Sequence, residues 1–194
     1  VLAVLFGVAL AGVQRALDGR IQSNKKADTM SQLPSLTPGA VSGEAGPYGD
    51  LLAYKTVSAD GRQVGWVVQA SGQGFADKIE VLIGLSTDLS TITGLYVLFQ
   101  NETPGLGNKI VDSGPDSYRA QFAGKSTAES LTVTKNGDGA PENDKIDAIT
   151  GATISSQMVA RMPPSLWGTV RPKRPLRTGR RRRTNVPAPG RRTT

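Results

Sequence analysis

Apolar side chains recur at every second position in two stretches, 62–69 and 78–85, which lie between two further runs rich in apolar residues at 52–57 and 91–99. This period of two indicates β-strands, because successive side chains of a strand point to opposite faces. Asp60-Gly61 separates 52–57 from 62–69 and is a common hairpin turn. The Gly-rich residues 71–74 are expected to end the second strand. Short strands joined by tight turns predict an antiparallel sheet, with strands over residues 52–57, 62–69, 78–85 and 91–99.

The sequence after residue 101 predicts shorter elements around this sheet. Residues 116–123 are expected to form a short helix that turns Tyr118 and Phe122 inward, four positions apart. A short strand is expected at 131–134, a polar loop at 135–145 and a helix from Thr153. The predicted fold class is therefore α+β, mostly antiparallel sheet with flanking helices.

The first 13 residues, Val1–Val13, are all apolar or small, and Arg15 follows them closely. Thirteen helical residues reach about 20 Å, whereas a membrane-spanning helix needs about 20 residues. We favour the truncated end of a transmembrane helix, because polar helix-forming sequence continues to Lys26. The alternatives are the apolar part of a signal peptide, with Ala9-Leu10-Ala11 as the cleavage site, and a buried core helix.

The predicted organisation therefore has four parts. Residues 1–26 are a clipped membrane-anchor helix with its juxtamembrane stretch, 27–50 a linker rich in Pro, Gly and Ser, 51–161 the folded domain, and 162–194 a disordered tail. The prolines of Met162-Pro163-Pro164 are expected to end the last helix.

Charge is distributed unevenly between the folded part and the tail. The whole chain has a formal charge of +7, but the first 160 residues hold 12 Lys and Arg against 16 Asp and Glu. The tail is rich in Arg, Pro and Gly, a composition that does not pack a core. One interpretation is a non-catalytic binder of nucleic acid or an anionic membrane surface. We favour a frameshift product of GC-rich DNA and expect no nucleic-acid partner, because the folded part is acidic.

The chain contains no Cys and no His. These absences exclude disulfides, thiol catalysis, Ser-His dyads and metal sites that depend on either residue. Acid–base catalysis by side chains is therefore not expected, and a cofactor would supply the reactive chemistry of the protein. No catalytic residue and no metal ligand is predicted.

Two short motifs carry the chemical signal of the sequence. The first is Asp147-Ala148-Ile149-Thr150-Gly151-Ala152-Thr153, which continues into Ile154-Ser155-Ser156. The second is Glu102-Thr103-Pro104-Gly105-Leu106-Gly107, about 45 residues earlier. Each motif alone is compatible with an ordinary turn or helix cap. The two together, in this order, form a specific pattern.

The Asp-x-x-Thr-Gly-Ala-Thr pattern resembles the flavinylation motif of FMN-binding domains, and both motifs together resemble the RnfG family. The resemblance covers about residues 1–160 and extends to NqrC, a related component of the sodium-translocating NADH:quinone oxidoreductase. It implies that FMN is held on Thr153 through a phosphoester bond, installed from FAD by a separate flavin transferase with Mg²⁺.

The same resemblance implies the protein's setting. An RnfG-like chain is an electron-carrier subunit of a membrane-bound, ion-translocating ferredoxin:NAD oxidoreductase, and its partners are the other subunits of that complex. It would lie in the bacterial cytoplasmic membrane with one N-terminal helix, and its FMN domain would face the extracytoplasmic, or periplasmic, side. An NqrC-like subunit is the alternative.

The residue types of both motifs suit a flavin site. A Thr hydroxyl needs an external enzyme to become a nucleophile, and the only base in the motif is Asp147. The small residues beside it leave room, and free N–H groups at a helix start favour a phosphate. Ser155 and Ser156 are expected to donate to the same phosphate. The predicted cofactor-binding residues are Thr153, Thr150, Gly151, Ala152, Ser155 and Ser156, with Glu102, Thr103, Gly105, Leu106 and Gly107 from the second motif.

The second motif is expected to line the flavin ring and not to attach it. Gly105 and Gly107 permit close backbone approach, and Leu106 offers an apolar contact. Glu102 is expected to stabilise the loop as a carboxylate and not to act as a proton donor.

Overall fold

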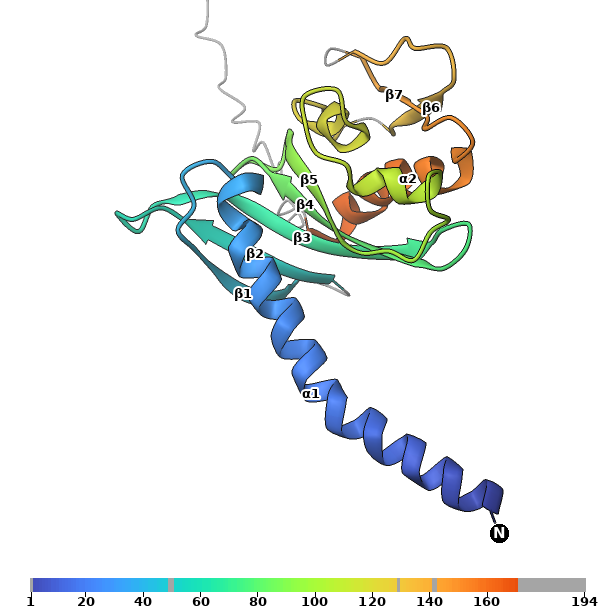
Figure 1. The fold of residues 1–194 in the computed structure, drawn as a ribbon. Helices are drawn as coiled ribbons and strands as arrows, with labels where there is room; N and C mark the ends of the chain where they lie inside the picture. Colours follow the sequence, from blue (N-terminus) through green and yellow to red (C-terminus); the bar gives the residue numbers. More distant parts are fainter. Residues whose placement is uncertain (1, 49–50, 129, 141–142, 171–194) are drawn as a thin grey trace, which may run out of the picture.

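The computed structural model describes residues 2–48, 51–128, 130–140 and 143–170 (Figure 1). Two long helices flank a sheet, and the short helices and strands lie on the same side of the sheet as the second helix. The elements are α1 (Leu2–Leu36), β1 (Ser42–Tyr48), β2 (Leu51–Val57), β3 (Gln63–Gln73), β4 (Lys78–Leu85), β5 (Ile92–Phe99), η1 (Gly107–Val111), η2 (Tyr118–Phe122), β6 (Thr132–Thr134), β7 (Lys145–Asp147) and α2 (Thr153–Val170).

The five strands β1 to β5 form one antiparallel sheet in sequence order. The predicted meander and α+β class are therefore confirmed, including the bounds of β4. The second strand runs on through Gly72 to Gln73, so the break expected at 71–74 comes later. At Gly72 this strand packs closely against the side chain of Met158 in α2. The strands β6 and β7 pair in parallel, which the sequence did not predict.

The sheet buries side chains on both of its faces. One face carries Tyr54, Val67 and Leu82 and packs against α1. The other carries Val68, Val81 and other alternating residues, and packs against α2, η1 and η2. Strand β4 is buried along almost its whole length, because both faces of the sheet are covered there. The site described below lies on the α2 face.

The linker predicted over 27–50 is wrong, because these residues complete α1 and form β1. Leu33 and Leu36 are buried against the sheet, which extends the helix to Leu36. Strand β1 is rich in Gly and contains Pro47, which resembles a linker in sequence. It lies at the sheet edge, where one side of the strand needs no hydrogen bonds and proline is tolerated.

The N-terminal half of α1 projects away from the sheet (Figure 1). Its large apolar side chains Val4, Phe6 and Leu10 are about 70% exposed, so the alternative of a buried core helix is not seen. Among residues 2–48, 51–128, 130–140 and 143–170, no helix combines the length and the apolar character needed to cross a membrane.

An ion-pair cluster joins the middle of α1 to the sheet. The carboxylate of Glu80 on β4 is buried and accepts from Lys25 at 2.8 Å and lies 2.9 Å from the ammonium of Lys78. Burial alone would raise the pKa of Glu80, but the two lysines together lower it below its usual value. The carboxylate therefore stays charged and holds α1 on the strand.

The last helix continues past its predicted end. Pro163 and Pro164 were expected to stop it, yet α2 runs to Val170. The φ of proline is compatible with a helix, although its missing N–H and the clash of its ring with the carbonyl four residues earlier destabilise an interior helical position. The remainder of the predicted tail, 171–194, lies outside the described residues.

The contact between α1 and the sheet predicts a loss of stability in Leu33→Ala. Leu33 is 1% exposed and lies against Gly43 of β1, so its truncation opens a cavity. We expect the free energy of unfolding to fall by about 2–5 kcal/mol. Urea denaturation of the detergent-solubilised chain, followed by circular dichroism, measures it. Leu52→Ala, at a 42% exposed side chain, is the control, and an equal loss there would contradict the assignment.

Candidate functional site

Residues of both motifs meet in one cleft of about 400 Å³ at the start of α2. Eight of the eleven expected site residues line it. They are Glu102, Thr103, Leu106, Gly107, Gly151, Ala152, Thr153 and Ser155, joined by Phe75, Lys135 and Ile154. Such a volume is within the range of small-molecule and cofactor sites.

The carboxylate of Glu102 holds the cleft together. One oxygen accepts the hydroxyl proton of Ser155, in the first turn of α2, at 2.5 Å. The other accepts the backbone N–H groups of Ala76 and Asp77, in the β3–β4 turn, at 3.0 and 3.3 Å. Glu102 itself follows β5 and is 5% exposed. One buried side chain thus joins three segments that are distant in the sequence.

These donors also decide the charge of Glu102. Burial raises the pKa of a carboxyl, but the hydrogen bonds from Ser155 and from the backbone of Ala76 and Asp77 outweigh burial and lower the pKa of Glu102. The group is therefore a carboxylate at neutral pH and an acceptor only. This geometry supports the expected loop-stabilising role.

Gly107 and Gly151 are glycines for steric reasons. A Cβ at Gly107 would lie 2.7 Å from Glu102 Oε2 and 2.9 Å from Ser155 Oγ, inside the hydrogen bond that joins them. Gly151 has φ +79°, and a Cβ there would lie 2.8 Å from a methyl carbon of Leu106. The two motifs therefore touch through these positions.

Thr153 begins α2 and is partly buried on the wall of the cleft. Within the described part of the chain, no hydrogen bond to the N–H groups of Thr153, Ile154 or Ser155 is found. Free N–H groups at a helix start attract a phosphate, and Ala152 before them has no side-chain acceptor to cap them.

The two serines differ from the expectation that both donate to a phosphate. Ser155 lines the cleft but gives its proton to Glu102. Ser156 is fully buried outside the cleft, donates to the carbonyl of Ala152 at 2.9 Å and accepts from Ile149 N–H at 3.1 Å. Ser156 thus fixes the helix start, and the hydroxyl of Tyr118 donates to its carbonyl at 2.6 Å. Burial raises the pKa of Tyr118.

A smaller cleft of about 300 Å³ adjoins the first at Thr153. Thr150 is exposed and lines only this second cleft. Lys135, Gly151 and Thr153 line both clefts. Gly105, with φ +78°, lines neither and shapes the loop that carries Leu106.

Three lining residues were missed by the sequence reasoning. Phe75 is 67% exposed in the β3–β4 turn, and Ile154 is 53% exposed in α2. Phe75 follows the predicted strand break at 71–74, and Ile154 continues the first motif, but the exposure of a large apolar residue is not visible in a sequence. Lys135 belongs to a segment interpreted only as a polar loop. Trp66, which was expected in the core, is partly buried and packs against the core on the α2 face of the sheet.

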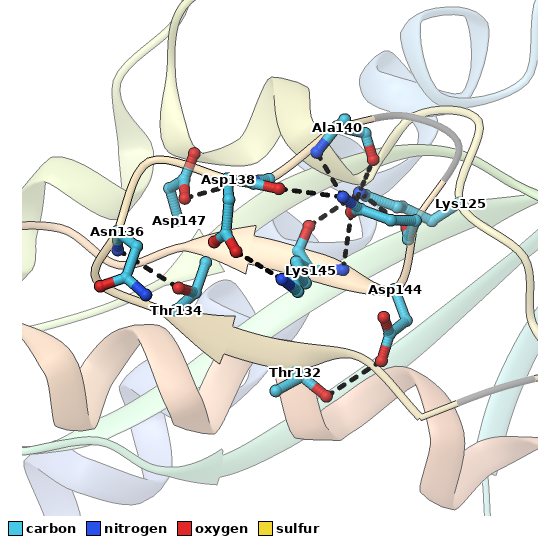
Figure 2. A network of polar contacts seen from close by, with 11 residues as sticks. Lys125, Thr132, Thr134, Asn136, Asp138, Ala140, Asp144, Lys145 and Asp147 are labelled. Atoms are coloured by element: carbon cyan, nitrogen blue, oxygen red, sulfur yellow. Dashed lines mark hydrogen bonds and ion pairs between the residues drawn. The ribbon is translucent and has the colours of Figure 1, made fainter.

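A buried cation orders the segment that carries Lys135 (Figure 2). Lys125 is 1% exposed, and its ammonium donates to carbonyl oxygens of Ala140, Asn143 and Lys145, the last two at 3.0 and 2.7 Å. The ammonium of Lys145 pairs in turn with Asp138. These contacts hold the β6–β7 loop against η2 and β7.

Asp147, the only base in the motif, faces this loop. Its carboxylate accepts the N–H of Gly139 at 3.1 Å (Figure 2). Its backbone N–H and carbonyl bond to the side-chain amide of Gln121. Asp147 therefore positions the motif through the loop and does not line either cleft.

The residues of the larger cleft fit a flavin. Phe75, Leu106 and Ile154 are exposed apolar side chains at its wall, as a planar apolar ring requires. Thr153 offers a hydroxyl beside free N–H groups, where a phosphate is favoured. Gly107 and Gly151 let the two motifs approach each other closely at this wall.

Comparisons with known proteins agree with this chemistry. The family model of the FMN-binding domain matches residues 74–162. The G subunit of the ion-translocating oxidoreductase complex of Methanosarcina acetivorans is 42% identical over 109 residues, which are 56% of this chain and 53% of that protein. The G subunit of the Na⁺-translocating ferredoxin:NAD⁺ oxidoreductase complex of Acetobacterium woodii is 40% identical over 111 residues, 57% of this chain and 51% of that protein.

A solved structure shows the same fold. NqrC of Shewanella oneidensis superimposes with a TM-score of 0.51 at 24% identity, over 68% of this chain and 67% of that one. Residues 74–162 are thus an FMN-binding domain. The chain is similar to the G subunits of ion-translocating oxidoreductase complexes and, at lower identity, to the C subunit of the Na⁺-translocating NADH-quinone reductase. It spans about half the length of the curated relatives it matches.

The contacts of Glu102 predict a pH-dependent contribution to stability. Its pKa is lower in the folded than in the unfolded chain, so its contribution is present above the unfolded pKa and is lost as the pH falls through the folded pKa. We expect Glu102→Gln to lose about 1–3 kcal/mol at neutral pH and to approach the wild type in acid.

Urea denaturation of both proteins between pH 7 and pH 3 measures this difference. Glu44→Gln, at an exposed carboxylate of β1, is the control and should show little loss at any pH. A loss in Glu102→Gln that stays constant over the whole range would contradict the role of its charge.

Proposed function

We propose that this protein is the electron-carrier subunit of a membrane-bound, ion-translocating ferredoxin:NAD oxidoreductase and holds FMN covalently on Thr153. One observation carries the proposal: Thr153 and the Glu102–Gly107 loop line the same cleft. The Acetobacterium woodii relative is named as a subunit of such a complex, which supports the assignment. An NqrC-like role is the alternative, since NqrC of Vibrio anguillarum is 32% identical over 98 residues. The genes adjacent to this one would distinguish the two complexes.

The attachment is a phosphoryl transfer from FAD. The Oγ1 of Thr153 forms a bond to the phosphorus of the FMN half, the pyrophosphate P–O bond breaks, and AMP leaves. The hydroxyl proton passes to a base of the transferase, because Asp147 faces the β6–β7 loop and, among the described residues, Glu102 is the one carboxylate that lines the clefts and is already hydrogen-bonded. A separate flavin transferase with Mg²⁺ is therefore part of the proposal.

The cleft residues then serve the bound cofactor. FMN supplies electron transfer through its ring, which the phosphoester leaves unmodified. Phe75, Leu106 and Ile154 cover the ring and limit water, while Glu102 keeps the β3–β4 turn and α2 in place. The small residues Gly151 and Ala152 leave the hydroxyl of Thr153 accessible.

Membrane association is assigned to the N-terminal half of α1. Its apolar side chains, including Phe6, Leu10 and Val13, are more than half exposed, which supports contact with lipid or with other subunits of the complex. We propose a single-pass anchor with the FMN domain on the extracytoplasmic side. The alternative of an anion-surface binder depends on 162–194, most of which lies outside the described residues.

The attachment predicts that Thr153→Val abolishes covalent flavin while the domain still folds. The valine keeps the size of the side chain and removes the only atom that can bond to phosphorus. Co-expression with a flavin transferase, intact mass and fluorescence on a denaturing gel measure the loading. Thr132→Val is the matched control, because Thr132 is exposed on β6 and lines neither cleft, and it should retain flavin. Fluorescence that persists on the Thr153→Val protein would disprove the assignment.

The role of the loop predicts that Leu106→Ala keeps the mass shift at Thr153 and changes the flavin itself. Water that enters beside the ring solvates the reduced, charged flavin, so the midpoint potential should rise by about 10–30 mV. Spectroelectrochemistry measures it. Val111→Ala, at a similarly exposed side chain outside the cleft, is the control. If Leu106→Ala leaves the potential and the spectrum unchanged, the Glu102–Gly107 loop is only a turn. If the variant folds but is not loaded with FMN, the loop is instead recognised by the transferase.

A further inference from the structure

Lys135 lies between the two clefts that meet at Thr153. Its side chain lines the larger cleft with Leu106 and Phe75 and the smaller cleft with Thr150. Only Gly151 and Thr153 share this position with it. A positive charge here is therefore beside any group that is attached to the hydroxyl of Thr153.

The charge of Lys135 is available for an anion. Within the described residues it is the only basic side chain that lines either cleft, and no ion pair to it is found there. Nearby lysines differ: Lys145 pairs with Asp138, and the ammonium of Lys125 donates to backbone carbonyls. The one carboxylate of the larger cleft, Glu102, already accepts three hydrogen bonds.

We infer that Lys135 holds the phosphate of FMN, an inference that rests on the proposed attachment at Thr153. A phosphodiester carries one negative charge at neutral pH, and an ammonium is a compact partner for it. The inference divides the cofactor between two subsites. The larger cleft, with Phe75, Leu106 and Ile154, takes the flavin ring, and the smaller, with Lys135 and Thr150, takes the phosphate and the adjoining ribityl chain.

The backbone that carries Lys135 is fixed before any cofactor arrives. Lys135 directly follows β6, and the N–H of Asn136 bonds to the hydroxyl of Thr134 at 3.2 Å (Figure 2). The other end of the loop is held by the carbonyl contacts of Lys125. A pre-ordered loop loses little entropy when its side chain meets a charge, which favours a binding role over a chance position.

The test uses the full chain, co-expressed with a flavin transferase. Lys135→Met removes the charge, Lys135→Arg keeps it, and Lys109→Met removes an exposed charge of η1 that lines neither cleft. Intact mass gives the rate and extent of loading, and ³¹P NMR of the loaded proteins at low and high NaCl reports on the phosphate. A charge beside the phosphate contributes most to the salt dependence of its resonance, because exposed charges more than about 10 Å away are largely screened at 0.1 M salt.

We expect Lys135→Met to load about two- to fivefold more slowly, the factor of a partly exposed ion pair, and to lose the salt dependence of the ³¹P resonance. Lys135→Arg and Lys109→Met should resemble the wild type. Lys135→Met could fold but fail to load FMN, and Lys135→Arg then decides. If Lys135→Arg loads FMN and shows a salt-dependent resonance, the inference is supported. If Lys135→Arg also fails to load, the inference is overturned.

Other outcomes separate the inference from the proposed function. A loaded Lys135→Met protein with the wild-type resonance and salt dependence overturns the role of Lys135 and leaves the attachment at Thr153 in place. If the wild type gains no mass at Thr153, the proposed attachment fails and the inference fails with it.

Discussion

The carboxylate of Glu102 is the contact on which the site depends. It joins the β3–β4 turn, the loop after β5 and the first turn of α2 through three hydrogen bonds. A charge buried this deeply is costly unless donors surround it, and here two backbone N–H groups and a hydroxyl do so. Gly107 follows from the same contact, because any Cβ there would enter the space between Glu102 and Ser155.

The sheet separates the two tasks that we propose for the protein. One face carries α1. Its residue Leu33 packs against the strands, and its residue Lys25 forms an ion pair with Glu80. The other face carries α2 and both clefts. Contact with membrane or partner subunits through α1 therefore leaves the proposed flavin site open on the opposite side of the sheet. The strand β4 makes this possible because it is buried on both faces.

Local patterns correctly predicted the elements in which regularly spaced side chains are buried. The alternation over 78–85 predicted β4 with its bounds, and Tyr118 and Phe122 are buried as their spacing indicated. Prediction was wrong where packing overrode composition. Strand β1 looked like a linker, and α2 passes the prolines that were expected to end it. For β1 the reason is its edge position, which tolerates a proline that a central strand would exclude.

The sequence by itself determined the meander, the absence of Cys and His chemistry, and two motifs whose order indicates a flavin site. Only the tertiary structure decided which residues face that site. It placed Ser156 in the core and bound Ser155 to Glu102, and it brought Phe75 and Lys135 from other segments to the clefts. The reason is physical: a motif specifies local backbone and chemistry, whereas partners distant in the sequence are selected by how the sheet and α2 pack.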